Sequence, residues 1–204
     1  MRRRAYVAVR ISPDGTKIAM DIRDQQLDIW TWDIRREAMT RLTFDPSVDM
    51  CPVWTLDSKR ILWASLRATG IPVIFSQAAD GTGTNDRLTP TLTTPVFPTS
   101  MSPDGKAVIW ENAARTSQDI LTLDLTTQKS TPLIATPAAE LDGEVSPDGK
   151  WLAYESTNRA TLRSTPGPFP TSTPDAGRSR RREGRVQRGA RVATKSFTST
   201  RAAA

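Results

Sequence analysis

The sequence of 204 residues contains no histidine and a single cysteine, Cys51. Without histidine, the chain cannot build a Ser-His-Asp triad, a Cys-His dyad or a His-ligated zinc site of its own. One cysteine excludes an internal disulfide, and the neighbours Pro52 and Trp54 favour a buried strand residue over a reactive thiol. We therefore expect a non-enzymatic chain with no catalytic residues, no cofactor and no metal site.

Long apolar runs are also missing. No stretch approaches the ~20 residues that a membrane-spanning helix needs. The basic start, Met1–Arg4, is not followed by the apolar core of a signal peptide. We expect no membrane segment and no export signal in this chain. The location of the parent protein stays open, with a membrane-anchored or periplasmic protein among the alternatives.

Basic charge is distributed unevenly along the chain. The net charge is +6, but residues 1–158 hold 17 Lys/Arg against 20 Asp/Glu, whereas residues 159–204 hold 11 against 2. The first part is therefore acidic, and the whole basic excess lies in an Arg/Pro/Thr-rich tail. Such a tail cannot bury enough apolar surface to fold alone. We place a domain boundary near Asn158 and predict a disordered tail over residues 159–204.

A turn of the type Ser-Pro-Asp-Gly recurs along the first part. Proline presets φ for a type I turn, Asp suits the third position, and Gly accepts the positive φ of the fourth. Such a turn joins two antiparallel strands. The copies are separated by 43, 47 and 44 residues, which is the period of a four-stranded propeller blade. They are Ser12–Gly15, a decayed Thr55–Ser58, Ser102–Gly105 and Ser146–Gly149.

The order of elements around each turn is also repeated. An inner strand, the turn, an apolar second strand, a third strand and a closing segment such as Arg41–Thr43 occur three times. The fourth copy stops after its second strand, at about Ser156. We therefore predict an all-β fold, a partial β-propeller of about three and a half four-stranded blades. The expected blades are residues 5–45, 46–92, 93–137 and, in part, 138–158.

These residues resemble the PD40, or TolB-type, subclass of WD40-like propellers over about residues 5–158. The resemblance rests on the three Ser-Pro-Asp-Gly turns and on the strand Asp28–Asp33. More narrowly, Asp28–Trp30 with Arg41–Asp45 resembles the propeller that follows the kinase domain in many bacterial serine/threonine protein kinases, and the segments Gln77–Gly83 and Gly143–Ser156 strengthen that match. The resemblance implies an interaction or sensor module, and the kinase motifs themselves are absent from this sequence.

Two other function classes stay open. One is the substrate-gating propeller of a prolyl-oligopeptidase-like serine peptidase, which needs a Gly-x-Ser-x-Gly elbow and a histidine outside this chain. The other is a periplasmic TolB-like protein-binding scaffold, which needs an export signal. In each case the partner is a protein or a small ligand on a propeller face. Nucleic acid is not expected, because the basic tail has too few aromatic residues for base stacking.

An incomplete ring has consequences for association. Propellers typically close with about four to eight blades, and an open array exposes sheet edges and blade flanks that invite pairing. We consider two explanations, a truncated reading frame and a half-propeller that dimerises into a closed ring. Self-association through the open edges is expected from either.

The genetic code allows us to ask whether the tail is translated in the wrong reading frame. If each true codon combines the third base of one printed codon with the first two bases of the next, residues 159–178 can yield a run that contains V-Y-A-R-P-F-P. That run supplies the missing third strand of the last blade. We therefore predict a frameshift near residue 158, with a functional basic arm or another disordered tail as the alternatives.

Three other groups of residues could suggest a binding site, but we interpret each of them as part of the structure. The acid pairs Asp21 with Asp24 and Asp142 with Glu144 match no EF-hand pattern and are read as solvated loop charges. The segment Gly81–Thr84 lacks the Lys-Ser/Thr of a phosphate loop and is predicted to be the hairpin between third and fourth strands. The six tryptophans are expected to pack in blade cores rather than to form a sugar platform. They are Trp30, Trp32, Trp54, Trp63, Trp110 and Trp151.

Overall fold

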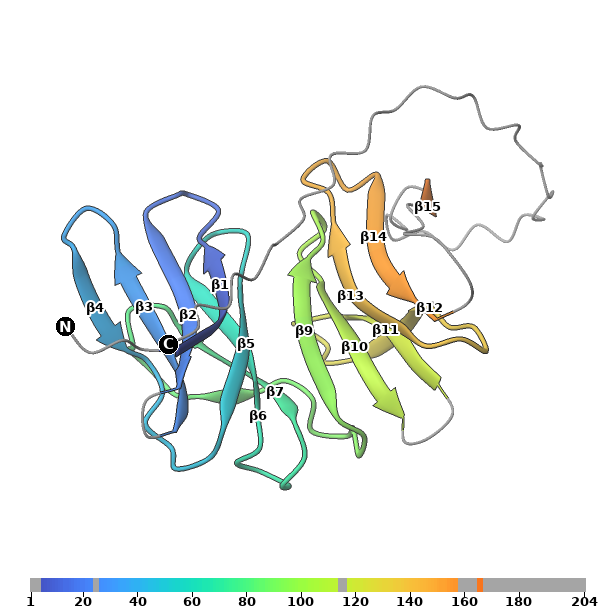
Figure 1. The fold of residues 1–204 in the computed structure, drawn as a ribbon, viewed down its shortest axis with the longest axis horizontal. Helices are drawn as coiled ribbons and strands as arrows, with labels where there is room; N and C mark the ends of the chain where they lie inside the picture. The colour runs from blue at the N-terminus through green and yellow to red at the C-terminus, as the bar shows by residue number, and fades with distance from the viewer. Residues whose placement is uncertain (1–4, 24–25, 114–116, 158–164, 167–204) are drawn as a thin grey trace, which may run out of the picture. The chain divides into compact units, whose positions relative to one another are not determined.

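The computed structural model describes residues 5–23, 26–113, 117–157 and 165–166. Every regular element among them is a β-strand, and strands consecutive in sequence form four antiparallel sheets (Figure 1). This confirms the all-β, partial-propeller prediction. No described residue belongs to a helix that could cross a membrane. The predicted tail, apart from Thr165–Pro166, lies outside the described residues.

We call the four sheets blades 1 to 4, in chain order. Blade 1 holds β1 (Ala5–Ile11), β2 (Lys17–Arg23), β3 (Leu27–Asp33) and β4 (Ala38–Arg41). Blade 2 holds β5 (Asp49–Trp54), β6 (Arg60–Ser65), β7 (Val73–Ala78) and β8 (Asp86–Arg87). Blade 3 holds β9 (Val96–Met101), β10 (Ala107–Ala113), β11 (Ser117–Leu123) and β12 (Ser130–Ile134). Blade 4 holds β13 (Glu140–Val145), β14 (Trp151–Ser156) and β15 (Thr165–Pro166).

The recurring turns form the hairpins between first and second strands, as predicted. In the first copy, the N–H of Gly15 donates to the carbonyl of Ser12 at 2.8 Å, and Gly15 has φ +70°. The Ser12 hydroxyl donates to the carboxylate of Asp14 at 2.6 Å and accepts from the N–H of Lys17 at 2.9 Å. The decayed copy keeps this geometry, because Ser58 adopts φ +59° in place of glycine.

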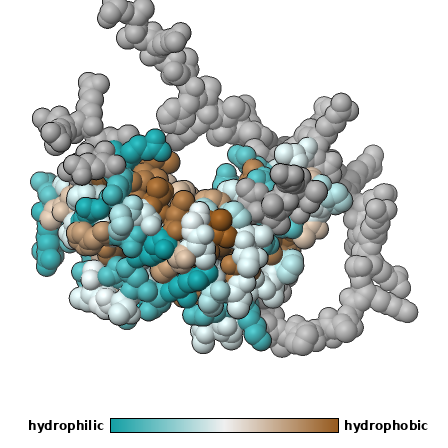
Figure 2. Space-filling view, turned by 90° about the horizontal axis from the view of Figure 1, so that it is seen from below, coloured by the Kyte–Doolittle hydropathy of each residue, from teal (hydrophilic) through white to brown (hydrophobic). Residues whose placement is uncertain are grey.

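Apolar residues of the second strands hold neighbouring blades together. Because side chains alternate between the faces of a strand, β6 directs Ile61 and Trp63 toward Ala19 and Ile29 of blade 1. The residue between them, Leu62, joins a cluster with blade 3 instead. A third cluster joins blades 3 and 4. The core is therefore a series of blade-to-blade layers, while apolar side chains also reach the surface among hydrophilic ones (Figure 2).

The tryptophan prediction holds only in part. Trp54 and Trp63 are buried in the layer between blades 1 and 2. Trp151, however, has 46% of its surface exposed, so the prediction is wrong for this residue. Its carbonyl accepts from the N–H of Ser146, the place that Lys17 and Arg60 take after the first two turns. Lys17 and Arg60 are only half-buried at this first position of their strands, which explains why Trp151 is not in the core.

Blade 4 has one strand more than the repeat predicted. The two-residue β15 pairs with the start of β14, where Trp151 lies opposite Pro166 and Leu152 opposite Thr165. It takes the place of the third strand in the other blades. The segment Gly81–Thr84 connects β7 to β8, which confirms the predicted hairpin.

Candidate axial pocket

The first strand of every blade is interrupted by an irregularity in its pairing. Two residues of the first strand lie opposite one residue of the second in blades 1, 2 and 4, and blade 3 has one extra residue. Such bulges bend a strand and redirect its side chains. The bulged residues are Val7 and Ala8, Cys51 and Pro52, Thr99, and Asp142 and Gly143.

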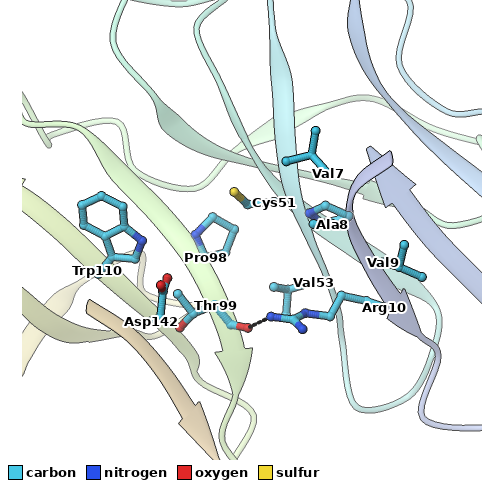
Figure 3. A pocket seen from close by; sticks show the side chains of 11 residues that line it. Val7, Ala8, Val9, Arg10, Cys51, Val53, Pro98, Thr99, Trp110 and Asp142 are labelled. Carbon is cyan, nitrogen blue, oxygen red and sulfur yellow. Dashed lines mark hydrogen bonds between the residues drawn. The ribbon is translucent and has the colours of Figure 1, made fainter. Parts of the chain in front are cut away.

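These bulges converge on one pocket of about 370 Å³ (Figure 3). We call it the axial pocket, because the first strands of all four blades contribute to its wall. All four bulges are represented there, and Trp110 of β10 adds an aromatic ring. Its lining residues are Val7, Ala8, Val9, Arg10, Cys51, Pro52, Val53, Pro98, Thr99, Trp110 and Asp142.

Two of the bulged residues have unusual backbone conformations. Cys51 has φ +58° and Asp142 has φ +52°, in the left-handed region that residues other than glycine rarely adopt. Such strain persists only where surrounding contacts enforce it, and it is concentrated at functional sites. Here the next residue after Asp142 supplies the contacts, because the Gly143 carbonyl accepts from the hydroxyls of Thr99 at 2.6 Å and Ser100 at 2.9 Å.

A buried carboxylate holds the first two bulges. Asp21 is fully buried on β2, and its two oxygens accept from the N–H of Ala8 at 2.5 Å and from the N–H of Cys51 at 3.0 Å. Each bulge therefore has a hydrogen bond that the strand ladder does not supply. The interpretation of Asp21 as a solvated loop charge is wrong, because Asp21 is buried and accepts hydrogen bonds from the two N–H groups that the bulges leave outside the ladder. Its predicted companion, Asp24, lies outside the described residues.

An arginine crosses the pocket between distant strands. The guanidinium of Arg10, on β1, lies 2.5 Å from a carboxylate oxygen of Glu144 on β13 and 3.4 Å from the Thr99 carbonyl on β9 (Figure 3 shows the contact with Thr99). Both charged side chains are about half exposed. Burial raises the pKa of Glu144, and the adjacent Arg10 opposes that rise. Asp142 and Glu144 are exposed as predicted, but they stand on a strand rather than in a loop.

Cys51 lines the pocket, but its thiol is protonated and unreactive at neutral pH. Burial, followed by the carboxylates of Asp21 and Asp142, raises the pKa of the Cys51 thiol to about 11. Because the thiolate is the nucleophilic form, almost all of this group is inactive thiol at neutral pH. Cys51 lies on a strand as predicted, although it is only partly buried. Among the described residues, no group of three or more Cys, Asp or Glu is arranged to hold a metal ion.

The sequence contained a signal for this pocket that its composition did not suggest. Ala8, Cys51 and Asp142 each lie four residues before the start of their turn, and Thr99, the single extra residue of blade 3, lies three before. Bulged positions are thus repeated with the turns. Residue types at these positions differ, so a search for catalytic patterns passes over them. Arg10 was not singled out either, and Trp110 was expected in a blade core rather than in the wall of a pocket.

Comparison with known proteins supports the architecture. A sequence model of the TolB β-propeller domain, PD40, matches residues 3–164. Among solved structures, TolB from Acinetobacter baumannii is 20% identical, with a TM-score of 0.63, over 74% of this chain and 37% of its own. A putative TolB from Agrobacterium tumefaciens is 17% identical, with a TM-score of 0.68, over 79% and 57%. The chain therefore spans only part of either relative.

Two peptidases also share the fold. One structure, from a study of two prolyl endopeptidases, is 16% identical, with a TM-score of 0.54, over 74% of this chain and 24% of its own. The tricorn protease is 14% identical, with a TM-score of 0.53, over 72% and 20%. At these identities, the likeness is one of fold.

Proposed function

This chain belongs to the TolB β-propeller domain family, and on that premise we propose that it is a non-enzymatic interaction module that binds a protein segment or a small ligand at the axial pocket. The observation that carries the proposal is the convergence of four strand bulges on one pocket with strained residues in its wall. Concave sites lined by a few fixed polar groups are the usual form of binding sites.

The chemistry of the pocket favours binding over catalysis. Its one thiol has a pKa raised to about 11, and the chain contains no histidine to act as a base. The Arg10 guanidinium is held by hydrogen bonds to Thr99 and Glu144, and the Asp142 carboxylate lies in the same wall, which suits recognition of a charged partner. Neither group is paired with a nucleophile.

The finer proposal is that the module is the sensor propeller of a receptor-like serine/threonine kinase. It rests on the resemblance of Asp28–Trp30, Arg41–Asp45 and Gly143–Ser156 to kinase-linked propellers. The coding sequence around this gene separates the candidates. A kinase domain upstream supports the proposal, whereas a hydrolase domain downstream indicates the peptidase propeller. A signal peptide with a small α/β domain indicates the periplasmic scaffold.

Site-specific crosslinking tests the binding role. We would replace Val7, in the pocket, with photoreactive p-benzoylphenylalanine and compare it with the same replacement at Leu56, an exposed turn residue. A discrete product that joins the protein to its bound partner is expected when the photoreactive residue is at position 7, and not when it is at position 56. Equal products at both positions, or none at position 7, contradict the proposal. Autophosphorylation or amide hydrolysis that tracks with the purified chain would contradict the non-enzymatic part.

A further inference from the structure

The axial pocket has charges of opposite sign on its two sides. Arg10 enters from blade 1, whereas Asp142 of blade 4 and Trp110 of blade 3 line the opposite side in the view of Figure 3. An aromatic ring together with a carboxylate is a favourable environment for an ammonium group. A guanidinium is the preferred partner of a carboxylate because it offers parallel N–H donors. The two sides therefore match the two ends of a zwitterion.

A side chain of this protein already occupies the place that a ligand carboxylate would take at Arg10. Glu144 lies 2.5 Å from the Arg10 guanidinium although the two residues are 134 positions apart in sequence. An exposed ion pair contributes little to stability, because water solvates both charges and long side chains lose freedom. Glu144 is therefore an exchangeable occupant of Arg10, and an incoming carboxylate can replace it at small cost.

The space between the charges is neutral and of limited size. Val7, Val53 and Pro98 give the wall an apolar part, and the pocket volume is about 370 Å³. That volume is at the low end of the range for small-molecule sites, roughly 300–1,000 Å³. It suits a compact molecule with one apolar side chain.

From these contacts we infer that the axial pocket binds a small zwitterion of the amino-acid class. The ligand's carboxylate binds Arg10 in place of Glu144, and its ammonium group lies against Asp142 and Trp110. The backbone of Asp142, held by the two hydroxyls on the Gly143 carbonyl, fixes the strand position from which this carboxylate extends before the ligand arrives. This inference rests on the proposed function and names the ligand class for the same pocket.

Calorimetric titration of the full chain with leucine, and with two derivatives that each lack one charge, tests the ligand class. N-acetylleucine lacks the ammonium group and leucinamide lacks the carboxylate. Leucine should bind at least about tenfold more tightly than either, since each derivative forfeits a charge-assisted hydrogen bond. Equal affinity for all three overturns the inference, as does the absence of any binding by leucine.

Three variants test the roles of Arg10, Asp142 and Glu144, because they should change the affinity for leucine in different directions. Arg10→Gln and Asp142→Asn should weaken leucine binding by about tenfold or more. Glu144→Gln should tighten it several-fold, because the competing carboxylate is gone. Arg36→Gln, on an exposed turn, is the matched control and should change nothing. If Glu144→Gln weakens leucine binding as Arg10→Gln does, the ligand carboxylate does not displace Glu144 from Arg10, and that part of the inference is wrong. If leucine fails to bind while the crosslink at position 7 persists, the inference fails and the binding role stands.

Discussion

The carboxylate of Asp21, on the second strand of blade 1, accepts a hydrogen bond of 3.0 Å from the backbone N–H of Cys51, on the first strand of blade 2. Its other oxygen accepts from the N–H of Ala8 in its own blade. One buried side chain thus fixes the bulges of two blades and, through them, one side of the axial pocket. Asp21, a polar residue in the core, therefore positions part of the pocket wall.

Removing that carboxylate should destabilise the junction between blades 1 and 2. Asp21→Ala removes the charged acceptor from two part-buried N–H donors, at a cost of about 1.5–3 kcal/mol for each hydrogen bond. We expect a lower urea midpoint and faster hydrogen exchange at the Ala8 and Cys51 amides. Glu155→Ala, an exposed strand position, is the control. Unchanged exchange at both amides in Asp21→Ala would show that Asp21 does not hold the bulges.

The recurring turns should make the fold sensitive to acid. Hydrogen bonds from Ser12, Thr55 and Ser146, respectively, lower the pKa values of Asp14, Asp57 and Asp148. A carboxyl whose folded pKa is depressed stabilises the fold above its unfolded pKa, and that stability is lost as pH falls through the folded pKa. The urea midpoint should therefore fall below about pH 4. Replacing the three turn aspartates with Asn should flatten this dependence, whereas Glu155→Gln should preserve it.

The thiol of Cys51 should react slowly at neutral pH and faster in alkali. Its pKa of about 11 leaves little thiolate at pH 7. The rate of alkylation by iodoacetamide should rise about tenfold per pH unit up to that value, since thiolate is the reactive form. The comparison is the unfolded chain in urea, in which the thiol has an ordinary pKa of about 8.5. A folded-state rate equal to the unfolded one at pH 7 would contradict the assigned pKa.

Exposed apolar side chains on β1, the first strand of blade 1, should promote self-association. Val9 and Ile11 have 52% and 65% of their surfaces exposed, and they lie opposite Met20 and Ile18 on one face of the sheet. Light scattering should give a mass above the 22.5 kDa of one chain. Val9→Lys with Ile11→Lys should shift the mass toward 22.5 kDa, while Leu56→Lys, at an exposed turn, should not. A sharp monomer peak from the unaltered chain refutes this prediction.

The frame of the gene is tested by sequencing the DNA around codons 155–160. A correction of one or two bases should restore a strand with a Tyr-x-Arg-Pro run after β14. The reason is that charge, periodicity and the repeat all change near Asn158. A verified frame, with close relatives that share the stretch from Arg178 to Arg191 as protein, would restore the basic arm as the leading explanation.

The repeat by itself determined the architecture of this protein. Short-range chemistry explains why: the sequence Ser12–Gly15 forms its turn from its own hydroxyl, carboxylate and glycine, and the same letters form it again at Ser102 and Ser146. Alternation of apolar residues after each turn then specifies the strands. These contacts join residues close in sequence, so a local pattern is enough to predict them.

Only the tertiary structure decided where the functional groups meet. Arg10 and Glu144 are 134 positions apart, and Asp21 and Cys51 are 30 apart. Their contacts depend on how successive blades are stacked and how far each bulge bends its strand, which no local pattern encodes. Asp21 illustrates the physical reason. A carboxylate in a sequence is read as solvated because exposure is its usual state, and only the two bulged N–H groups that converge on it make its burial favourable.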